Sequence, residues 1–156
     1  IIRFLTGDEV EDICCETVTR DKRYPDGRLI DLEDNASAIF HMKSGVFGTM
    51  NVSWTNYGEE DNSTIIYGDK GVMKIFGDFA DDIVVELRDD TRVKYQVGSI
   101  STNQKQLKSG IIDDFVGSII SGRQPTVTGQ DGHNTLAVIV AGKKSAEERR
   151  WLKVEY

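Results

Sequence analysis

Cysteine is scarce in this sequence, which has only two, adjacent to one another at Cys14 and Cys15. Neighbouring side chains of a strand point to opposite faces, so these thiols cannot bond to each other without strain. They also lack the C-x-x-C spacing of redox motifs, and packing is favoured over a redox role. This cysteine usage fits a reducing compartment, and we predict a cytoplasmic location.

Long apolar runs and an excess of positive charge are also missing. No stretch approaches the roughly 18 apolar residues of a transmembrane helix, and the N-terminus lacks the basic and apolar segments of a signal peptide. The formal net charge is -7. Such a negative field repels phosphate backbones and anionic lipids, so neither nucleic acid nor a membrane surface is expected as a partner.

Sequence motifs of nucleotide binding and serine hydrolysis are absent. There is no G-x-G-x-x-G, no G-x-x-x-x-G-K-[ST] and no G-x-S-x-G. The glycines fall instead in predicted hairpin turns, where none can admit a pyrophosphate to a helix N-terminus. We therefore expect this chain alone to bind no cofactor, and neither phosphoryl transfer nor serine hydrolysis is supported.

The two histidines, His41 and His133, lie far apart in the sequence. Asp131 near His133 offers a second potential metal ligand, but a site needs at least one more, and a helix start explains this Asp by itself. Structural roles are favoured for both histidines, and no metal site is predicted.

Hairpin signals dominate the first two thirds of the chain. Eight segments are predicted as strands: Val10–Arg20, Glu33–Met42, Val46–Trp54, Ser63–Tyr67, Val72–Phe76, Ile83–Arg88, Thr91–Val97 and Trp151–Tyr156. Alternation gives the second and third strands one apolar face each, formed by Ala36, Ala38, Phe40 and Met42 and by Val46, Gly48, Met50, Val52 and Trp54. Both faces are expected to be covered.

Two helices are predicted after these strands. Apolar residues recur at helical spacing over Leu107–Ile120. The second helix begins at a possible capping box, Thr128–Asp131, and continues to about Glu147. The order of elements favours an α+β fold, with a largely antiparallel open sheet of about seven to nine strands and two main helices packed on one face.

The N-terminus is typical of a helix that has just ended. Apolar residues at Ile1–Leu5 are followed by Gly7, a residue favoured just past a helix end, and there is no initiator Met. This pattern predicts that residues 1–7 are the tail of a helix from a preceding part of a larger protein. Residues 1–156 are expected to form one domain.

The loop after the third predicted strand offers groups suited to a sugar or polyol. Trp54, Asn56 and Tyr57 supply an indole, an amide and a phenol at one end of the sheet. The alternative is that Trp54 belongs to the core and Tyr57 is simply exposed. The residues by themselves favour this alternative.

Six segments, taken in order, resemble the C-terminal domain of the Gfo/Idh/MocA family (glucose-fructose oxidoreductase, inositol dehydrogenase and rhizopine catabolism). They are Arg3-Phe4-Leu5-Thr6-Gly7, Glu33-Asp34-Asn35-Ala36, Lys43-Ser44-Gly45-Val46-Phe47-Gly48 with Val52-Ser53-Trp54, Tyr67-Gly68-Asp69-Lys70-Gly71, Asp113-Asp114-Phe115-Val116, and Ser145-Ala146-Glu147. Each segment alone is common, but their order and spacing extend over nearly the whole chain.

The resemblance implies a two-domain enzyme of which this chain is the second half. A Rossmann domain, missing here, would bind NAD or NADP. A Lys in an E-K-P segment and a D-x-x-x-H pair on a helix would supply the catalytic groups upstream of Ile1, so no catalytic residue is expected here and the isolated chain should be inactive. The resemblance also implies a homodimer or tetramer formed through the other sheet face, which would bury Ile39, Phe47 and Val84.

Substrate contacts are also implied by the resemblance. Tyr57 matches a tyrosine near the bound polyol in inositol-dehydrogenase-like members, with Trp54 and Asn56 as supporting residues. Arg20 and Tyr24, in the long loop after the first strand, are further candidates.

These observations lead to one hypothesis and two alternatives. The first is the substrate-binding and oligomerisation domain of an NAD(P)-dependent oxidoreductase acting on a sugar, polyol or related hydroxy compound. The alternatives are a stand-alone, non-catalytic module that binds a ligand or dimerises, and a relative that uses NAD in glycoside cleavage. The missing half is what separates them.

Overall fold

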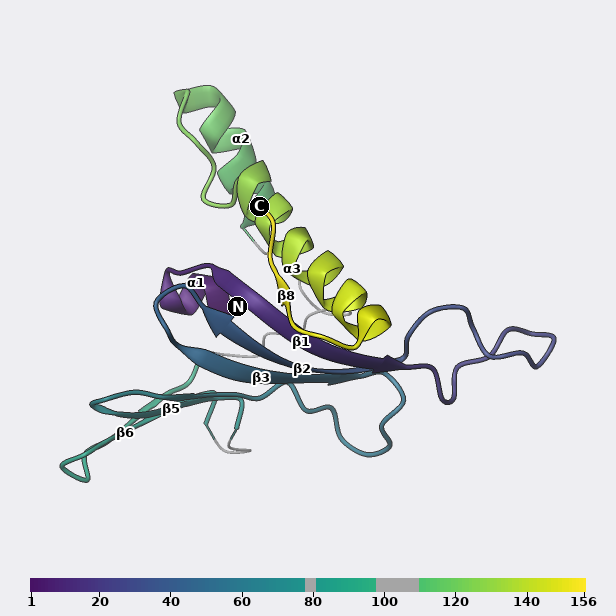
Figure 1. Cartoon of the computed structure of the whole chain (residues 1–156). Helices are drawn as coiled ribbons and strands as arrows, with labels where there is room; N and C mark the ends of the chain where they lie inside the picture. Colours follow the sequence, from purple (N-terminus) through teal and green to yellow (C-terminus); the bar gives the residue numbers. More distant parts are fainter. Residues whose placement is uncertain (78–80, 98–109) are drawn as a thin grey trace. The chain divides into compact units, whose positions relative to one another are not determined.

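The computed structural model (Figure 1) describes residues 1–77, 81–97 and 110–156. The elements are α1 (Ile2–Thr6), β1 (Val10–Val18), β2 (Asn35–Met42), β3 (Phe47–Ser53), β4 (Thr64–Tyr67), β5 (Gly71–Ile75), β6 (Ile83–Leu87), β7 (Arg92–Tyr95), α2 (Ile111–Ser121), α3 (Gly129–Glu148) and β8 (Leu152–Lys153). They match the predicted elements in type and order. Leu107, the predicted start of the first long helix, lies outside the described residues.

The strands form two antiparallel sheets. The first has the order β3-β2-β1-β8 and the second has the order β4-β5-β6-β7. The prediction of an α+β fold with antiparallel strands is confirmed, but the prediction of one open sheet of seven to nine strands is wrong. Hairpin signals pair neighbouring strands, and they do not specify whether β3 also pairs with β4, which here it does not.

The chain divides into two compact units. Residues 1–57 and 114–156 form the first unit, and residues 58–113 form the second. The first unit contains α1, α3 and the first sheet, and the second contains the second sheet. The single-domain assignment for residues 1–156 therefore stays a prediction.

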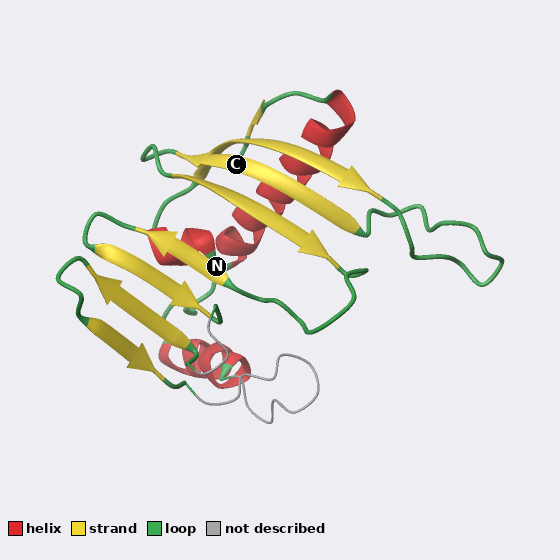
Figure 2. Ribbon diagram, turned by 90° about the horizontal axis from the view of Figure 1, so that it is seen from below, coloured by secondary structure: helices red, strands yellow, loops and turns green. Residues whose placement is uncertain are grey.

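The core of the first unit lies between α3 and the first sheet. Ile13, Phe40 and Met42 are buried there together with Ala141 of α3, and Figure 2 shows α3 lying across one face of this sheet. Gly142 brings the helix close to β1, because a Cβ at this position would already lie 3.4 Å from Ile13 Cδ1. The predicted apolar face of β2 is thus the face covered by α3.

Helix α3 has specific groups at both ends. At its start, Thr128 and Asp131 form the predicted capping box, in which each side chain accepts the other residue's backbone N–H. Near its end, the fully buried Ser145 hydroxyl donates to the Arg150 carbonyl at 2.6 Å and accepts the Cys15 N–H at 3.0 Å. None of the described helices combines the length and apolar character required to span a membrane.

Helix α2 differs from the prediction that both main helices pack on the sheet. Its apolar stripe is largely exposed, at 58% for Phe115, 66% for Ile119 and 75% for Ile112. The helical periodicity was sufficient to predict the helix, but it does not specify a partner. Only α3 is packed in the manner that the sequence predicts.

Strand β3 is an edge strand that α3 does not cover. The register pairs Met50 with the buried Ala38, and Val52 with Ala36, so these residues face the α3 side of the sheet. They are nevertheless 41% and 51% exposed, and Trp54 is 59% exposed. The expectation that this face is covered is therefore wrong for β3, because α3 packs on β1 and β2.

The opposite face of the first sheet carries exposed apolar side chains. Ile39 and Phe47 lie on it and are 46% and 72% exposed. Val84, expected on the same face, belongs instead to β6 of the second sheet and is fully buried. Of the three residues assigned to a subunit contact, Val84 is misplaced, since one continuous sheet was assumed.

The second sheet is a set of consecutive hairpins. Its strands pair in sequence order, with Met73 opposite both Ile66 and Val85. Lys74 of β5 donates to Glu86 of β6 at 2.9 Å across the sheet, and both β5 and β6 are labelled in Figure 1.

Candidate functional site

A cavity of about 290 Å³ opens at the end of the first sheet, where β2 begins and β3 ends. Its lining residues are Glu33, Asp34, Asn35, Ala36, Val52, Ser53 and Trp54. This volume is near the lower end for small-molecule pockets, which span roughly 300–1,000 Å³. Val52 and Trp54 are accessible here, and the Glu33 carboxylate at the same cavity pairs with Lys143 of α3 at 3.3 Å.

Asp34 is the most constrained residue at the cavity. Only 2% of its surface is exposed. Its carboxylate accepts the backbone N–H groups of Arg20, Asp21 and Lys22 at 2.8 to 3.0 Å, and the Asn35 side-chain amide donates at 2.6 Å. This buried carboxylate is thus satisfied by four neutral N–H donors.

The protonation of Asp34 follows from these bonds. Burial by itself would raise the pKa of its carboxyl group. The backbone N–H donors of Asp21, Lys22 and Arg20 outweigh burial and hold the pKa far below the ordinary value. Asp34 is therefore ionised at all physiological pH values.

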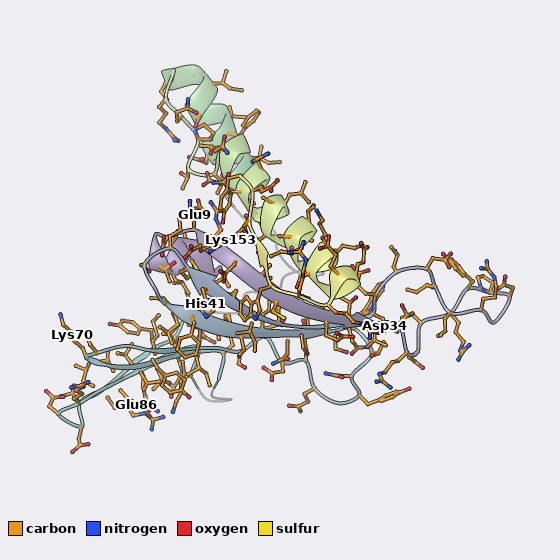
Figure 3. All side chains as sticks on the ribbon, in the orientation of Figure 1. Glu9, Asp34, His41, Lys70, Glu86 and Lys153 are labelled. Carbon is orange, nitrogen blue, oxygen red and sulfur yellow. The ribbon has the colours of Figure 1, made fainter. Side chains whose placement is uncertain are left out.

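Residues 19–33, which we call the arm, project from the end of the first sheet between β1 and β2 (Figure 1). The arm is a small hairpin, in which the Tyr24 N–H donates to Arg28 at 2.8 Å and the Ile30 N–H donates to Lys22 at 3.0 Å. Figure 3 shows Asp34 where the arm meets the sheet. The arm is therefore attached to the sheet at its base by Asp34.

Two of the predicted site residues meet at this corner of the sheet. Trp54 lines the cavity, and its backbone N–H donates to the Asp34 carbonyl at 3.2 Å. The Arg20 backbone is bound to the Asp34 carboxylate. The Lys22 ammonium, which was not predicted, lies 5.9 Å from the centre of the Trp54 ring.

Arg20 and the other three predicted residues are not among the lining residues of the cavity. Tyr57 is 94% exposed and Asn56 is also exposed. Tyr24 is engaged inside the arm, where its hydroxyl donates to Asp31 at 3.1 Å and its ring lies 5.0 Å below the Arg28 guanidinium. A role for these residues in substrate binding stays a prediction.

Sequence analysis missed the polar half of this cavity. Glu33, Asp34 and Asn35 were noted only as part of a family-like segment, and Ser53 was not considered. An available signal was the position of Asp34, because an Asp that follows a polar loop commonly accepts backbone N–H bonds. The hydrogen bonds from residues 20–22 to Asp34 join the two ends of the arm. These residues do not belong to one strand, so strand periodicity does not predict the bonds.

Both histidines lie near polar side chains, and the structural roles assigned to them stay a prediction. His41 Nδ1 lies 2.7 Å from Asp12 Oδ1, and the ring stacks on Trp151 at a centroid distance of 4.8 Å. His133 lies 3.4 Å from both Gln130 and Asn134 on α3. Across the described part of the chain, no three His, Cys, Asp or Glu side chains come together as a possible metal site.

A second cavity of about 560 Å³ lies between α3 and β8. Its floor includes Leu136, Val140 and Leu152. The cations at its rim are already paired, since Arg150 meets Glu148 and Lys153 meets Glu11. The cavity at Asp34 contains Trp54, which the sequence analysis singled out, beside a buried carboxylate, and we take it as the candidate site.

The chemistry at the candidate site is that of recognition. Trp54, Val52 and Ala36 provide an apolar wall, and Ser53, Asn35 and Glu33 provide hydroxyl, amide and carboxylate groups. Such a mixture can hold the C–H faces and hydroxyl groups of a sugar or polyol. The described strands pair only antiparallel and form no βαβ unit of the kind that binds dinucleotides. The expectation that this chain alone binds no cofactor stays a prediction.

Known proteins are similar to this chain in sequence and in fold. Residues 1–74 match the family model described as the GFO/IDH/MocA C-terminal domain. The chain is 30% identical to a myo-inositol 2-dehydrogenase of Thermotoga maritima, over 98% of the chain and 45% of that protein. The resemblance noted in the sequence is thereby confirmed.

Solved structures share the fold at lower sequence identity. A levoglucosan dehydrogenase in complex with NADH and levoglucosan superposes with a TM-score of 0.81 at 17% identity, over 99% of this chain and 47% of that one. An aldose-aldose oxidoreductase from Caulobacter crescentus complexed with glycerol superposes with a TM-score of 0.74 at 24% identity, over 97% of this chain and 43% of that one. The chain thus spans about half the length of the proteins it matches.

Proposed function

Since this chain has the sequence and fold of a Gfo/Idh/MocA C-terminal domain, we propose that it forms the substrate-binding half of an NAD(P)-dependent oxidoreductase acting on a sugar, polyol or related hydroxy compound. The observation that carries this proposal is the cavity at Asp34, with its Trp54 wall and its polar rim. The proteins named above, a myo-inositol dehydrogenase and a levoglucosan dehydrogenase, support the substrate class.

The residues of this chain would bind and orient the substrate. The indole of Trp54 would contact a C–H face, while Ser53 and Asn35 would bind hydroxyl groups. NAD(P), bound by a preceding Rossmann domain, would supply hydride transfer to or from a carbinol carbon. Proton transfer would depend on the Lys and His that the family resemblance places upstream of Ile1.

Tyr57 would complete the substrate side of the site, with Asn56 beside it and Arg20 and Tyr24 contributed by the arm. The exposed phenol of Tyr57 is free to meet a ligand. For assembly, we propose a homodimer or tetramer through the face of the first sheet on which Ile39 and Phe47 are exposed. Burial of these side chains on association would be favourable.

The test is an assay of the whole protein that contains this chain. The reading frame upstream of the Ile1 codon should encode G-x-G-x-x-G, E-K-P and D-x-x-x-H, and the purified protein should reduce NAD or NADP in the presence of cyclic polyols or aldoses. A start codon adjacent to Ile1 would instead indicate a stand-alone binding module. Turnover of an aryl glycoside that requires NAD without net NADH formation would indicate glycoside cleavage.

A further inference from the structure

The Asp34 main chain and side chain join three neighbouring segments at the candidate site. Its N–H donates to Val18 at the end of β1 at 3.1 Å, and its carbonyl accepts from Trp54 at the end of β3 at 3.2 Å. Its carboxylate accepts from residues 20–22 at the base of the arm. One residue thus fixes both the Trp54 wall and the arm that passes beside it.

The Asp34 carboxylate is unusual because no cation in the described part of the chain is paired with it. Among the described residues, no Lys, Arg or His lies within ion-pair distance of Asp34, although it is 2% exposed. A buried charge of this kind is stable only if several N–H groups point at it. Three consecutive N–H groups must therefore converge, which restricts the backbone of residues 20–22 to one arrangement.

This arrangement determines what faces the Trp54 ring. The Lys22 N–H is bound to Asp34 at 3.0 Å, and the side chain of the same residue places its ammonium 5.9 Å from the centre of the indole. Lys22 is also without a carboxylate partner among the described residues, so its ammonium is available as a hydrogen-bond donor. A hydroxyl-rich ligand that lies against Trp54 would be within reach of this ammonium.

We propose that Asp34 is a positioning residue of the substrate site, which fixes the base of the arm so that the Lys22 ammonium lies beside Trp54, a lining residue of the cavity, within reach of a hydroxyl-rich ligand bound there. Lys22 is then a specificity-determining residue that donates to a substrate hydroxyl. The assignment of a polyol as the ligand rests on the proposed function. The coupling of arm and wall through Asp34 depends only on the geometry.

The test compares Asp34→Asn with Asp26→Asn. The amide introduced by Asp34→Asn would present an NH₂ group to N–H donors that now meet a carboxylate oxygen, so the base of the arm should be released. Asp26 is a matched control, because it lies in the same arm and is exposed, with Arg28 as its partner. Lys22→Met provides a second route, since it removes the positioned ammonium and leaves the carboxylate and its bonds intact.

Two measurements decide the proposal. In a Trp151→Phe background, acrylamide quenching of Trp54 should increase in Asp34→Asn and remain unchanged in Asp26→Asn. In the whole protein, Asp34→Asn should raise KM for the polyol by roughly tenfold, and Lys22→Met by about threefold, with KM for NAD(P) unchanged.

Each outcome has a defined meaning. Unchanged quenching of Trp54 in Asp34→Asn would overturn the coupling of arm and wall. Increased quenching together with an unchanged polyol KM in both Asp34→Asn and Lys22→Met would reduce Asp34 to a structural residue and overturn its role at the site. If the unsubstituted protein turns over no polyol, the proposed function fails, whereas the quenching result still decides the coupling.

Discussion

Arg3 and Glu9 form a two-pronged ion pair between α1 and the start of β1. Arg3 Nε and Nη2 donate to the two Glu9 carboxylate oxygens at 2.5 and 2.6 Å. Arg3 also donates to the Asp131 carbonyl and the Thr135 hydroxyl of α3, and Asn134 donates to Glu9 at 2.9 Å. The pair therefore connects the N-terminal helix to β1 and to the first turns of α3.

Glu9→Gln should destabilise the first unit in a pH-dependent manner. Hydrogen bonds from Arg3 outweigh burial and, with Asn134, lower the pKa of Glu9 from 4.5 to about 2. A lowered folded-state pKa gives stability that is present above pH 4.5 and is lost as the pH falls towards 2. We expect a loss of about 2 kcal/mol at pH 7, measured by urea unfolding with tryptophan fluorescence.

The control for this prediction is Glu11→Gln, which removes an exposed carboxylate that meets Lys153 across the surface. It should cost at most about 0.5 kcal/mol. Both tryptophans, Trp54 and Trp151, belong to the first unit and report on its unfolding. A difference between Glu9→Gln and the unsubstituted chain that is as large at pH 2 as at pH 7 would contradict the assigned ion pair.

Ser145→Ala should destabilise the contact between α3 and β1. Strand β8 pairs only with Asp12 and Ile13, so the Cys15 N–H farther along β1 depends on the Ser145 hydroxyl at 3.0 Å. Loss of the hydroxyl leaves this N–H and the Arg150 carbonyl without their partner, at a cost of about 1–3 kcal/mol. The control is Ser121→Ala, at an exposed serine on α2, and thermal unfolding compares the two variants. Equal melting temperatures would refute the role of Ser145 in joining α3 to β1.

Gly48→Ala should disturb the core beneath β3. Gly48 lies opposite Phe40 in the register, and a Cβ there would lie 2.5 Å from Phe40 Cζ. The buried ring must then move, at a cost of about 1–3 kcal/mol. Gly132→Ala is the matched control, since a Cβ at this helical position meets nothing within 4 Å and should be neutral or stabilising. Equal free energies of unfolding for the two variants, measured by chemical denaturation, would argue against this packing.

The local structure of this chain was largely predictable from its residues. The capping box at Thr128 and Asp131, the alternation that buries Phe40 and Met42, and Gly7 at the end of α1 each depend on neighbours in sequence. The split into two sheets was not predictable, because the pairing or separation of β3 and β4 depends on contacts between distant segments. The exposure of α2 was missed for the same reason, since a helical stripe does not specify its partner.

The candidate site was predictable only in part. Trp54, which lines the cavity, is visible in sequence as an aromatic residue at a strand end, but it became a candidate only through the family resemblance. Asp34 was missed as a site residue because its importance comes from three N–H groups that the arm brings back to it. Lys22 was missed because its position over the indole follows from those bonds.

The central claim is that this chain forms the substrate side of an NAD(P)-dependent oxidoreductase, and Tyr57→Phe in the whole protein tests it most directly. Steady-state kinetics with myo-inositol and related polyols should show a loss of roughly tenfold in kcat/KM for the polyol, the worth of one hydrogen bond. Calorimetry should show an unchanged Kd for NAD(P). Tyr67→Phe, which alters an exposed phenol in the second sheet, should have no effect. Unchanged polyol kinetics in Tyr57→Phe would remove this residue from the site, and a whole protein that reduces neither NAD nor NADP with any polyol or aldose would contradict the account.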